Sequence, residues 1–335
     1  MKTTLYTFLF SLTLSLASYG HDKAWTAGRP DGHAPISVMG DHMHAMGEWM
    51  ISYRYMTMEM EGLLDGSKNI SASDASSTFG YNNMMIPKDM TMDMHMFGAM
   101  HAISNKWTLM CMLNYLDHEM TMQSTMMGTM KSDGFSDLKV AGLYDLAQWE
   151  DGRRMHLKLG LSLPTGSIDE KYEGKILGYG MQLGSGTYDF EPAITYLGQT
   201  ENYSYGAQVG GILRIGENDQ DYTLGNKFEA TLWGARKITE SLSASVKFDY
   251  SSQSEIDGSD KRIQMRRSMD SPTFDPKSQG RDITTLGLGL NYYFQNGGLK
   301  GHRLAAEWET PIDQKVNGVQ LELDPTWTLG WQYAW

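Results

Sequence analysis

Methionine and histidine offer the most specific chemistry in this sequence, and methionine is concentrated in its first third. Of the 26 methionines, 22 lie at or before Met130, and many recur at every second position, as in residues 56–60 and 90–96. A thioether is a soft ligand that, with a few imidazoles, suits Cu(I) or Ag(I) better than Zn, Mg or Ca. The pattern indicates Cu(I) handling. The competing interpretation is that flexible Met side chains fill an irregular interior or contact apolar solutes.

The candidate ligands follow from the direction in which each side chain points if these segments are β-strands. When Trp49, Tyr53 and Trp107 face outward, the Met residues at alternate positions of the same strands face inward. In residues 90–103, either the Met set or a set containing Asp93 and His101 could face inward, and we favour the Met set. The candidate metal ligands are His42, His44, Met50, Met56, Met58, Met60, Met92, Met94, His95, Met96, Met110 and Met112.

A short cluster, Asp41-His42-Met43-His44, precedes the first of these segments. If residues 21–45 form a periplasmic N-terminal segment, the cluster lies at the periplasmic end of the strands that follow it. It could capture an ion there. The alternative is a polar periplasmic tail that binds nothing.

Alternation with a period of two is the commonest regular pattern in the chain. In residues 242–250, for example, Leu242, Val246 and Phe248 share one face while Ser243 and Lys247 share the other. Segments of about ten such residues are typical of strands that span a membrane. Reading the chain in this way predicts twelve strands, near residues 46–60, 90–103, 106–122, 136–149, 153–165, 186–198, 203–216, 223–237, 241–255, 281–295, 302–312 and 319–335.

The connections and the carboxy end support a barrel. The gaps after the even-numbered strands are short, and most of the others are longer, as expected for short periplasmic turns and longer extracellular loops. In the last segment, Trp327, Trp331 and Trp335 alternate with small or polar residues, which would be an aggregation hazard on an uncovered face in water. We therefore predict an all-β, transmembrane antiparallel up-and-down β-barrel of about twelve strands. Pro192 falls inside the sixth strand, so we expect a bulge or a break there.

The amino end predicts export to the outer membrane. Residues 1–20 resemble a secretory signal peptide, with Lys2, an apolar core and small residues that allow cleavage after Ala17 or Gly20. The division is then a signal peptide at 1–20, a periplasmic segment at 21–45 and an outer-membrane barrel at 46–335. The expected partners are outer-membrane lipid, the barrel-assembly machinery, and a metal ion or small solute.

Several classes of function are disfavoured. The net charge of −12 argues against a nucleic-acid partner, and the single cysteine, Cys111, cannot give an internal disulfide. We do not expect an enzyme, because no His is followed by Ser two positions later as in barrel phospholipases, and the Gly-rich residues 178–186 lack the sequence of a phosphate loop. We assign no catalytic residue and no cofactor other than Cu(I) as a ligand or substrate.

Three stretches, 135–144, 159–166 and 184–190, together resemble outer-membrane transporters of the phenol meta-cleavage pathway protein family, over about residues 130–335. The resemblance implies a barrel that passes small, often apolar molecules, and it carries over no catalytic residue. The first third looks like a Met-rich subgroup associated with copper resistance, and its composition is similar to outer-membrane copper resistance proteins of the B type. Our leading hypothesis is a Cu(I) channel or binding barrel. The alternatives are a transporter of small hydrophobic or aromatic solutes and a structural or adhesive barrel with a plugged interior.

Overall fold

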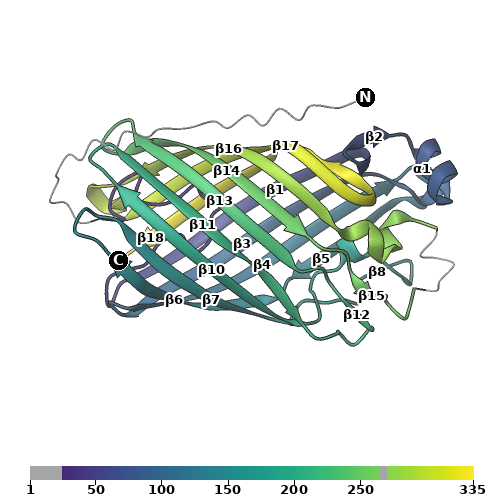
Figure 1. The fold of residues 1–335 in the computed structure, drawn as a ribbon, viewed down its shortest axis with the longest axis horizontal. Helices are drawn as coiled ribbons and strands as arrows, with labels where there is room; N and C mark the ends of the chain where they lie inside the picture. The colour runs from purple at the N-terminus through teal and green to yellow at the C-terminus, as the bar shows by residue number, and fades with distance from the viewer. Residues whose placement is uncertain (1–24, 264–269) are drawn as a thin grey trace, which may run out of the picture.

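The computed structural model describes residues 25–263 and 270–335, so the expected signal peptide at 1–20 lies outside the described residues. The described chain forms a closed antiparallel β-barrel of twelve strands, which confirms the predicted class and strand count (Figure 1). The barrel closes by pairing its first strand with its last, from Met50 opposite Ala334 to Thr57 opposite Trp327. No helix among the described residues is long and apolar enough to cross a membrane.

Each strand of the wall pairs with the next strand along the chain. A short strand, β5 (Thr129–Phe135), also pairs with β4 and leads into β6, and β2 (Lys68–Ile70) folds back on the end of β1. The twelve strands are β1 (Trp49–Gly66), β3 (Pro87–Ser104), β4 (Trp107–Met122), β6 (Leu138–Gln148), β7 (Arg154–Leu163), β10 (Tyr188–Gln199), β11 (Tyr203–Ile215), β13 (Lys227–Lys237), β14 (Leu242–Gln253), β16 (Arg281–Tyr293), β17 (His302–Leu323) and β18 (Thr326–Ala334).

The alternation in the sequence becomes an apolar outer face and a more polar inner face. On β13, Leu232 is 61% exposed on the outside of the barrel, while its neighbours Thr231 and Trp233 are buried. On β18, Trp327 and Leu329 are exposed and alternate with buried Thr328. Because successive side chains of a strand point to opposite faces, this pattern gives the barrel a belt suited to lipid.

The two ends of the barrel differ as expected. One end has short turns between neighbouring strands and carries the C-terminus (Figure 1), and this end faces the periplasm in outer-membrane barrels. The other end carries longer loops with small elements of their own. These are α1 (Ala72–Phe79), β8 (Lys171–Tyr172), β9 (Lys175–Ile176), β12 (Tyr222–Thr223), β15 (Asp257–Gly258) and five 3-10 helices at Asn83–Met85, Thr125–Met127, Tyr179–Met181, Pro272–Phe274 and Pro276–Gln279; a sixth, Gly297–Leu299, lies at the short-turn end.

The predicted boundary between the last two strands is wrong. We expected a turn at 313–318, but β17 continues through these residues to Leu323, and the turn lies at Asp324-Pro325. Polar residues such as Asp313 and Lys315 look like turn formers, yet they pair with Thr284 and Asp282 of β16. The strand here stands beyond the lipid belt, where polar side chains on both faces cost nothing, so hydropathy alternation no longer marks it.

Candidate functional site

The Met-rich strands β1, β3 and β4 lie side by side, and their register brings inward-facing residues into rows across the wall. Residues opposite one another on neighbouring antiparallel strands have Cβ atoms about 4.5–5.5 Å apart, so side chains within a row can meet. The rows are Met50–Met100–Met110, Ser52–Gly98–Met112, Arg54–Met96–Asn114, Met56–Met94–Leu116, Met58–Met92–His118 and Met60–Met90–Met120. We call these six rows the Met wall.

Burial shows that the Met set of β3 points inward, as we favoured. Met90, Met96 and Met100 are buried, whereas Phe97 and Ile103 are exposed on the outside. His95 therefore lies on the outer face, away from the other candidate ligands. Its Nδ1 lies 2.8 Å from the hydroxyl of Tyr53. The proposed role of His95 as a ligand together with the Met set is not supported by this placement.

The other Met candidates are brought together as expected, in two packed groups along the wall. At the short-turn end, Met50, Met100, Met110 and Met112 form one buried cluster around Leu143. At the long-loop end, a second cluster joins residues of the wall to residues of the loops. Its methionines are Met60, Met90, Met120, Met122, Met130 and Met181, with Met58, Met92 and Met127 packed against it. Met56 and Met94 lie on the wall between the two groups and are half-buried.

His118 shares a row with Met58 and Met92, although it is not among the ligands predicted from the sequence. His118 is almost fully buried, and its Nδ1 lies 3.3 Å from the hydroxyl of Ser132 on β5. Among the described residues, its Nε2 has no hydrogen-bond partner. This row therefore presents two thioethers and one free imidazole nitrogen. The signal was available in the sequence, because His118 has the same parity as Met110, Met112 and Met120 on β4.

Charged pairs also face the bore, and one of them lies beside the Met wall, where Lys139 is paired with Met112 across the ladder. Lys247 on β14 lies 3.1 Å from Glu307 and 2.6 Å from Glu309, both on β17, and Lys139 on β6 lies 2.6 Å from Glu191 on β10. These groups are largely buried and paired, as charges away from bulk water must be. The bore thus carries buried ionic pairs as well as thioethers.

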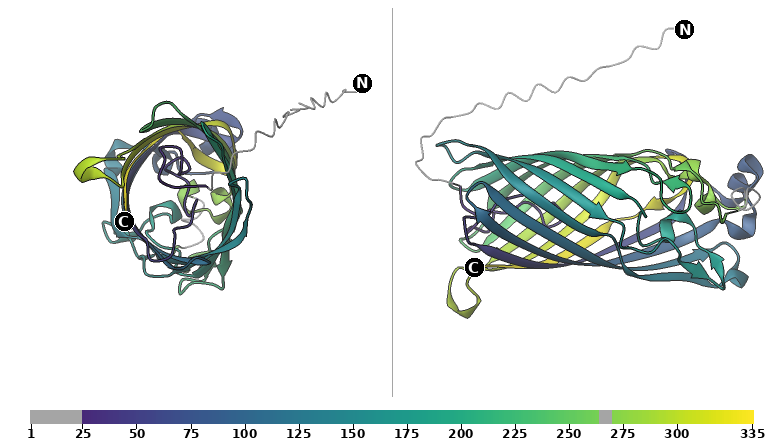
Figure 2. Two further views of the ribbon diagram at one scale, coloured as in Figure 1. Left: turned by 90° about the vertical axis from the view of Figure 1, so that its left-hand side faces the viewer. Right: turned by 90° about the horizontal axis from the view of Figure 1, so that it is seen from below.

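Residues 25–48, which we call the plug, lie inside the bore at the short-turn end (Figure 2). The sequence predicts that residues 21–45 form a periplasmic segment ahead of the barrel. From residue 25 onward the chain folds back into the barrel instead, because the lumen offers partners for its backbone. Arg303 of β17 donates to the carbonyls of Pro30 and Ala27 at 2.7 and 2.9 Å, and His156 of β7 lies 2.8 Å from the carbonyl of Gly40.

Apolar contacts hold the plug as well. Trp25, Ala34 and Val38 pack with Leu197 and Trp233 of the wall. Ile36 lies against Gly330 on β18, where a Cβ atom would come within 2.4 Å of the Ile36 side chain. Glycine is needed there because the plug approaches the strand backbone closely.

Four ionisable side chains of the plug, His33, Asp41, His42 and His44, come together and are all buried. We call them the plug cluster. One donor atom from each of His33, Asp41 and His42 lies within 4.8 Å of the others, and the ring centroids of His33 and His42 are 3.9 Å apart. The ring of His44 lies 4.8 Å from that of His42. Two candidate ligands, His42 and His44, thus do lie together, but in the bore and away from solvent.

The surroundings of the cluster favour the neutral forms of His33 and His44 and the charged form of Asp41. Burial lowers the pKa of His33 well below its usual value, and the nearby Arg303 cation lowers it further. Burial also lowers the pKa of His44. For Asp41, burial raises the pKa, but the facing His42 and two hydrogen bonds outweigh it and lower the pKa to about 2. Neutral imidazole and carboxylate are the protonation states that bind metal ions.

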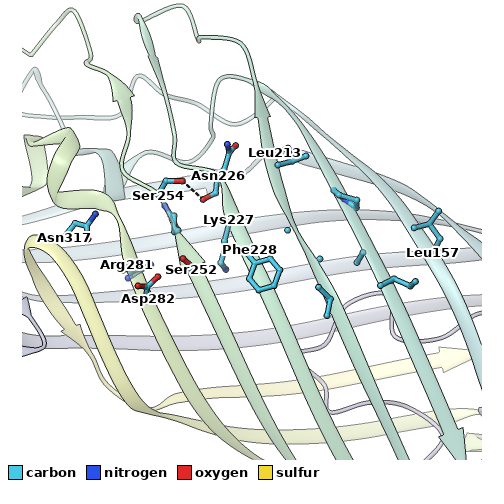
Figure 3. A pocket seen from close by; sticks show the side chains of 17 residues that line it. Leu157, Leu213, Asn226, Lys227, Phe228, Ser252, Ser254, Arg281, Asp282 and Asn317 are labelled. Carbon is cyan, nitrogen blue, oxygen red and sulfur yellow. Dashed lines mark hydrogen bonds between the residues drawn. The ribbon is translucent and has the colours of Figure 1, made fainter. Parts of the chain in front are cut away.

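The predicted disturbance at Pro192 is confirmed. In the ladder between β10 and β11, the pairing steps from Phe190 opposite Leu213 directly to Ala193 opposite Gly210, so Glu191 and Pro192 have no assigned partner on β11. A hollow of about 680 Å³ opens at this place, lined by residues from β10, β11, β13 and β14 (Figure 3). Its lining mixes apolar groups such as Phe228 and Leu213 with polar groups such as Lys227.

The closed barrel, its apolar belt and its filled bore define an outer-membrane β-barrel protein. The chain belongs to the family described as "Putative MetA-pathway of phenol degradation", whose profile matches residues 100–317. The match begins at Met100, so the Met-rich β1 and most of β3 lie outside it. No curated protein matches the sequence.

The solved structures that this chain resembles share little sequence with it. The COG4313 outer membrane channel from Pseudomonas putida F1 is 12% identical, with a TM-score of 0.66 over 89% of this chain and 99% of that one. The translocator domain of the autotransporter NalP from Neisseria meningitidis is 9% identical, with a TM-score of 0.46 over 88% and 90%. The KdgM porin is 11% identical, with a TM-score of 0.40 over 85% and 98%.

Proposed function

We propose that this protein is an outer-membrane channel or binding barrel that handles soft metal ions, with Cu(I) as the ion, through the Met wall. The observation that carries the proposal is the inward, row-by-row arrangement of thioethers on three neighbouring strands. Thioether sulfur and imidazole nitrogen together select Cu(I) over hard cations.

The spacing of the wall suits stepwise movement of an ion. Inward-facing residues repeat every second position along a strand, so successive rows lie about 7 Å apart. A wall of weak, similar sites lets an ion enter one row and leave to the next, as conduction requires. The row of Met58, Met92 and His118 offers the most varied donors, so we expect it to hold an ion longest.

The test replaces sulfur without changing shape. A variant with Met56, Met58, Met94 and Met96 all changed to Leu keeps the apolar volume and removes four soft donors. Met84 and Met126 are exposed in the loops at 41% and 83%, so Met84→Leu with Met126→Leu is the matched control. Cu(I) affinity is measured on the refolded barrel by competition with a chromophoric chelator, and copper tolerance is measured in cells that produce each form.

We expect the quadruple variant to lose at least tenfold in Cu(I) affinity and to change copper tolerance, while the loop control behaves as the wild type. Adding His118→Leu should weaken binding further, because it removes the imidazole from the row of Met58 and Met92. Equal affinity and tolerance in wild type and quadruple variant would refute the metal function.

The second candidate is passage of small hydrophobic or aromatic solutes, favoured by the hollow beside Pro192. An interrupted ladder in a barrel wall offers a place where an apolar solute could pass between the bore and lipid. Uptake of a small aromatic probe into vesicles that contain the barrel tests it. This function predicts uptake that is indifferent to copper and unchanged in the quadruple Met variant, and uptake equal to that of empty vesicles would exclude it.

A further inference from the structure

The three imidazoles of the plug cluster share one arrangement of hydrogen bonds. The Nδ1 atom of His33 lies 2.9 Å from Gln332 Oε1 on β18, and the Nδ1 atom of His42 lies 2.8 Å from Asp41 Oδ1. The Nδ1 atom of His44 lies 3.5 Å from Glu48 Oε2. His33 and His42 therefore each have an oxygen acceptor at Nδ1, and His44 has a carboxylate at ion-pair distance from Nδ1, an arrangement that favours the proton on Nδ1 and the lone pair on Nε2.

This is how metal-binding histidines are oriented by neighbouring groups. An acceptor on one ring nitrogen fixes the tautomer and directs the other nitrogen at the ion, and carboxylate–histidine–metal arrangements are the commonest form. Among the residues that the structure describes, the Nε2 atoms of His42 and His44 are buried with no hydrogen-bond partner. A buried polar atom without a hydrogen-bond partner lowers the stability of the fold by about 1–3 kcal/mol. Two such atoms in one small cluster therefore indicate that a ligand binds there.

We infer that the plug cluster is a binding site for a divalent metal ion of the Zn(II) and Cu(II) class, held by the Nε2 atoms of His33, His42 and His44, with the Asp41 carboxylate as the hydrogen-bond partner that orients His42. Imidazole donors suit such ions, whereas the thioethers of the Met wall suit Cu(I). The inference does not rest on the proposed function, because it concerns different donors and a different ion.

The geometry requires only a small adjustment. Zn–N and Zn–O bonds of about 2.0–2.2 Å place tetrahedral ligand atoms about 3.4 Å apart. The ring centroids of His33 and His42 lie 3.9 Å apart and those of His42 and His44 lie 4.8 Å apart, so the three rings are near enough to share one ion after side-chain rotation. Two cations, Arg54 and Arg303, also face the cluster. The negative charge of Asp41 offsets part of their positive charge.

A bound ion would link two parts of the plug to each other and strengthen the attachment of the plug to the barrel wall. The ion joins residue 33 to residues 41–44 across a loop of the plug, and His33 carries the link to Gln332 on β18. Because the plug lies in the bore, the ion would stabilise the folded plug at the short-turn end of the barrel.

The test is metal binding by the full refolded barrel. Zn(II) titration with a competing indicator should give one ion per barrel for the wild type, and His33→Ala and His42→Ala should each weaken binding at least tenfold. His302 contacts Trp331 and Tyr333 on the barrel wall outside the plug, so His302→Gln is the matched control and should bind as the wild type. Circular dichroism confirms that each variant retains its β-structure.

A second readout separates ligation from a loss of folding. The second readout uses Co(II) in place of Zn(II). The His42→Cys variant should bind the ion more tightly than His42→Ala does, and its spectrum should contain a thiolate-to-cobalt charge-transfer band that the wild type lacks. The quadruple Met→Leu variant should bind Zn(II) normally, so failure of the Cu(I) function leaves this site intact. Absence of Zn(II) binding by the wild type, or equal binding by His42→Ala, would overturn the inference.

Discussion

Replacing Arg303 by Met should release the plug while leaving the barrel folded. Arg303 is 2% exposed, and its guanidinium donates to the carbonyls of Ala27, Arg29 and Pro30 at 2.7–2.9 Å. Met keeps the length of the apolar stem but leaves three carbonyls without their donor. Each hydrogen bond to a charged group contributes about 1.5–3 kcal/mol. Since water from the short-turn end can replace part of this, we expect a loss of about 3–6 kcal/mol in the free energy that docks the plug.

Such a loss is large enough to measure directly. At 1.4 kcal/mol per tenfold change, the open population of the plug rises by about 10² to 10⁴. Hydrogen exchange of the amides in residues 27–38 should accelerate by that factor, while exchange in the strand amides stays slow. The control is Arg153→Met, because Arg153 pairs with exposed Asp151 outside the bore and such pairs contribute little. Unchanged exchange in the plug of the Arg303 variant would show that the three hydrogen bonds do not hold it.

Three further changes test the wall, each read by urea unfolding of the refolded barrel. Gly211→Ala should cost about 1–3 kcal/mol, because its Cβ would lie 2.2 Å from the carbonyl oxygen of Lys227, whereas Gly234→Ala, with open space around it, should be neutral; equal effects would contradict the close approach. Leu143→Ala should cost about 2–5 kcal/mol, since Leu143 is fully buried in the short-turn Met cluster, and a loss below 1 kcal/mol would mean that this cluster is loosely packed. Lys247→Met should cost about 3–5 kcal/mol by leaving Glu307 and Glu309 without their cation, and adding Glu307→Gln with Glu309→Gln should recover most of the loss; no recovery would show that these pairs are not the cause.

The barrel could be predicted from the sequence because apolar and polar residues alternate with a period of two along its strands. A strand with lipid on one side and the bore on the other must alternate apolar and polar residues. The pattern from Leu242 to Tyr250 therefore indicates a strand, and the short turns between such segments give the number of strands. The inward direction of Met50 and Met56 followed from the aromatic residues beside them. Prediction failed where the periodicity stops, as at 313–318, where β17 leaves the lipid and polar residues remain in a strand.

The plug could not be predicted, because nothing local specifies it. Residues 25–48 contain no run with a regular period, and their stability comes from partners up to 299 positions away, as in the contact of His33 with Gln332. The cluster of His33 with Asp41 and His42 depends on the same fold, so the sequence showed Asp41 to His44 as neighbours but gave no reason to include His33. The place of His118 opposite Met92 required the register of β3 against β4.

The contacts of the plug also set the order in which this molecule can be completed. Its amino-terminal residues are the first to emerge during synthesis, yet the side chains that hold them, at positions 303, 307 and 332, belong to the last two strands. The amino end must therefore wait, undocked, until translation and membrane insertion have delivered the carboxy end. A barrel that lacks its last two strands can offer the plug its contacts on β7, β10 and β13, but not the hydrogen bonds of Arg303, Glu307 and Gln332.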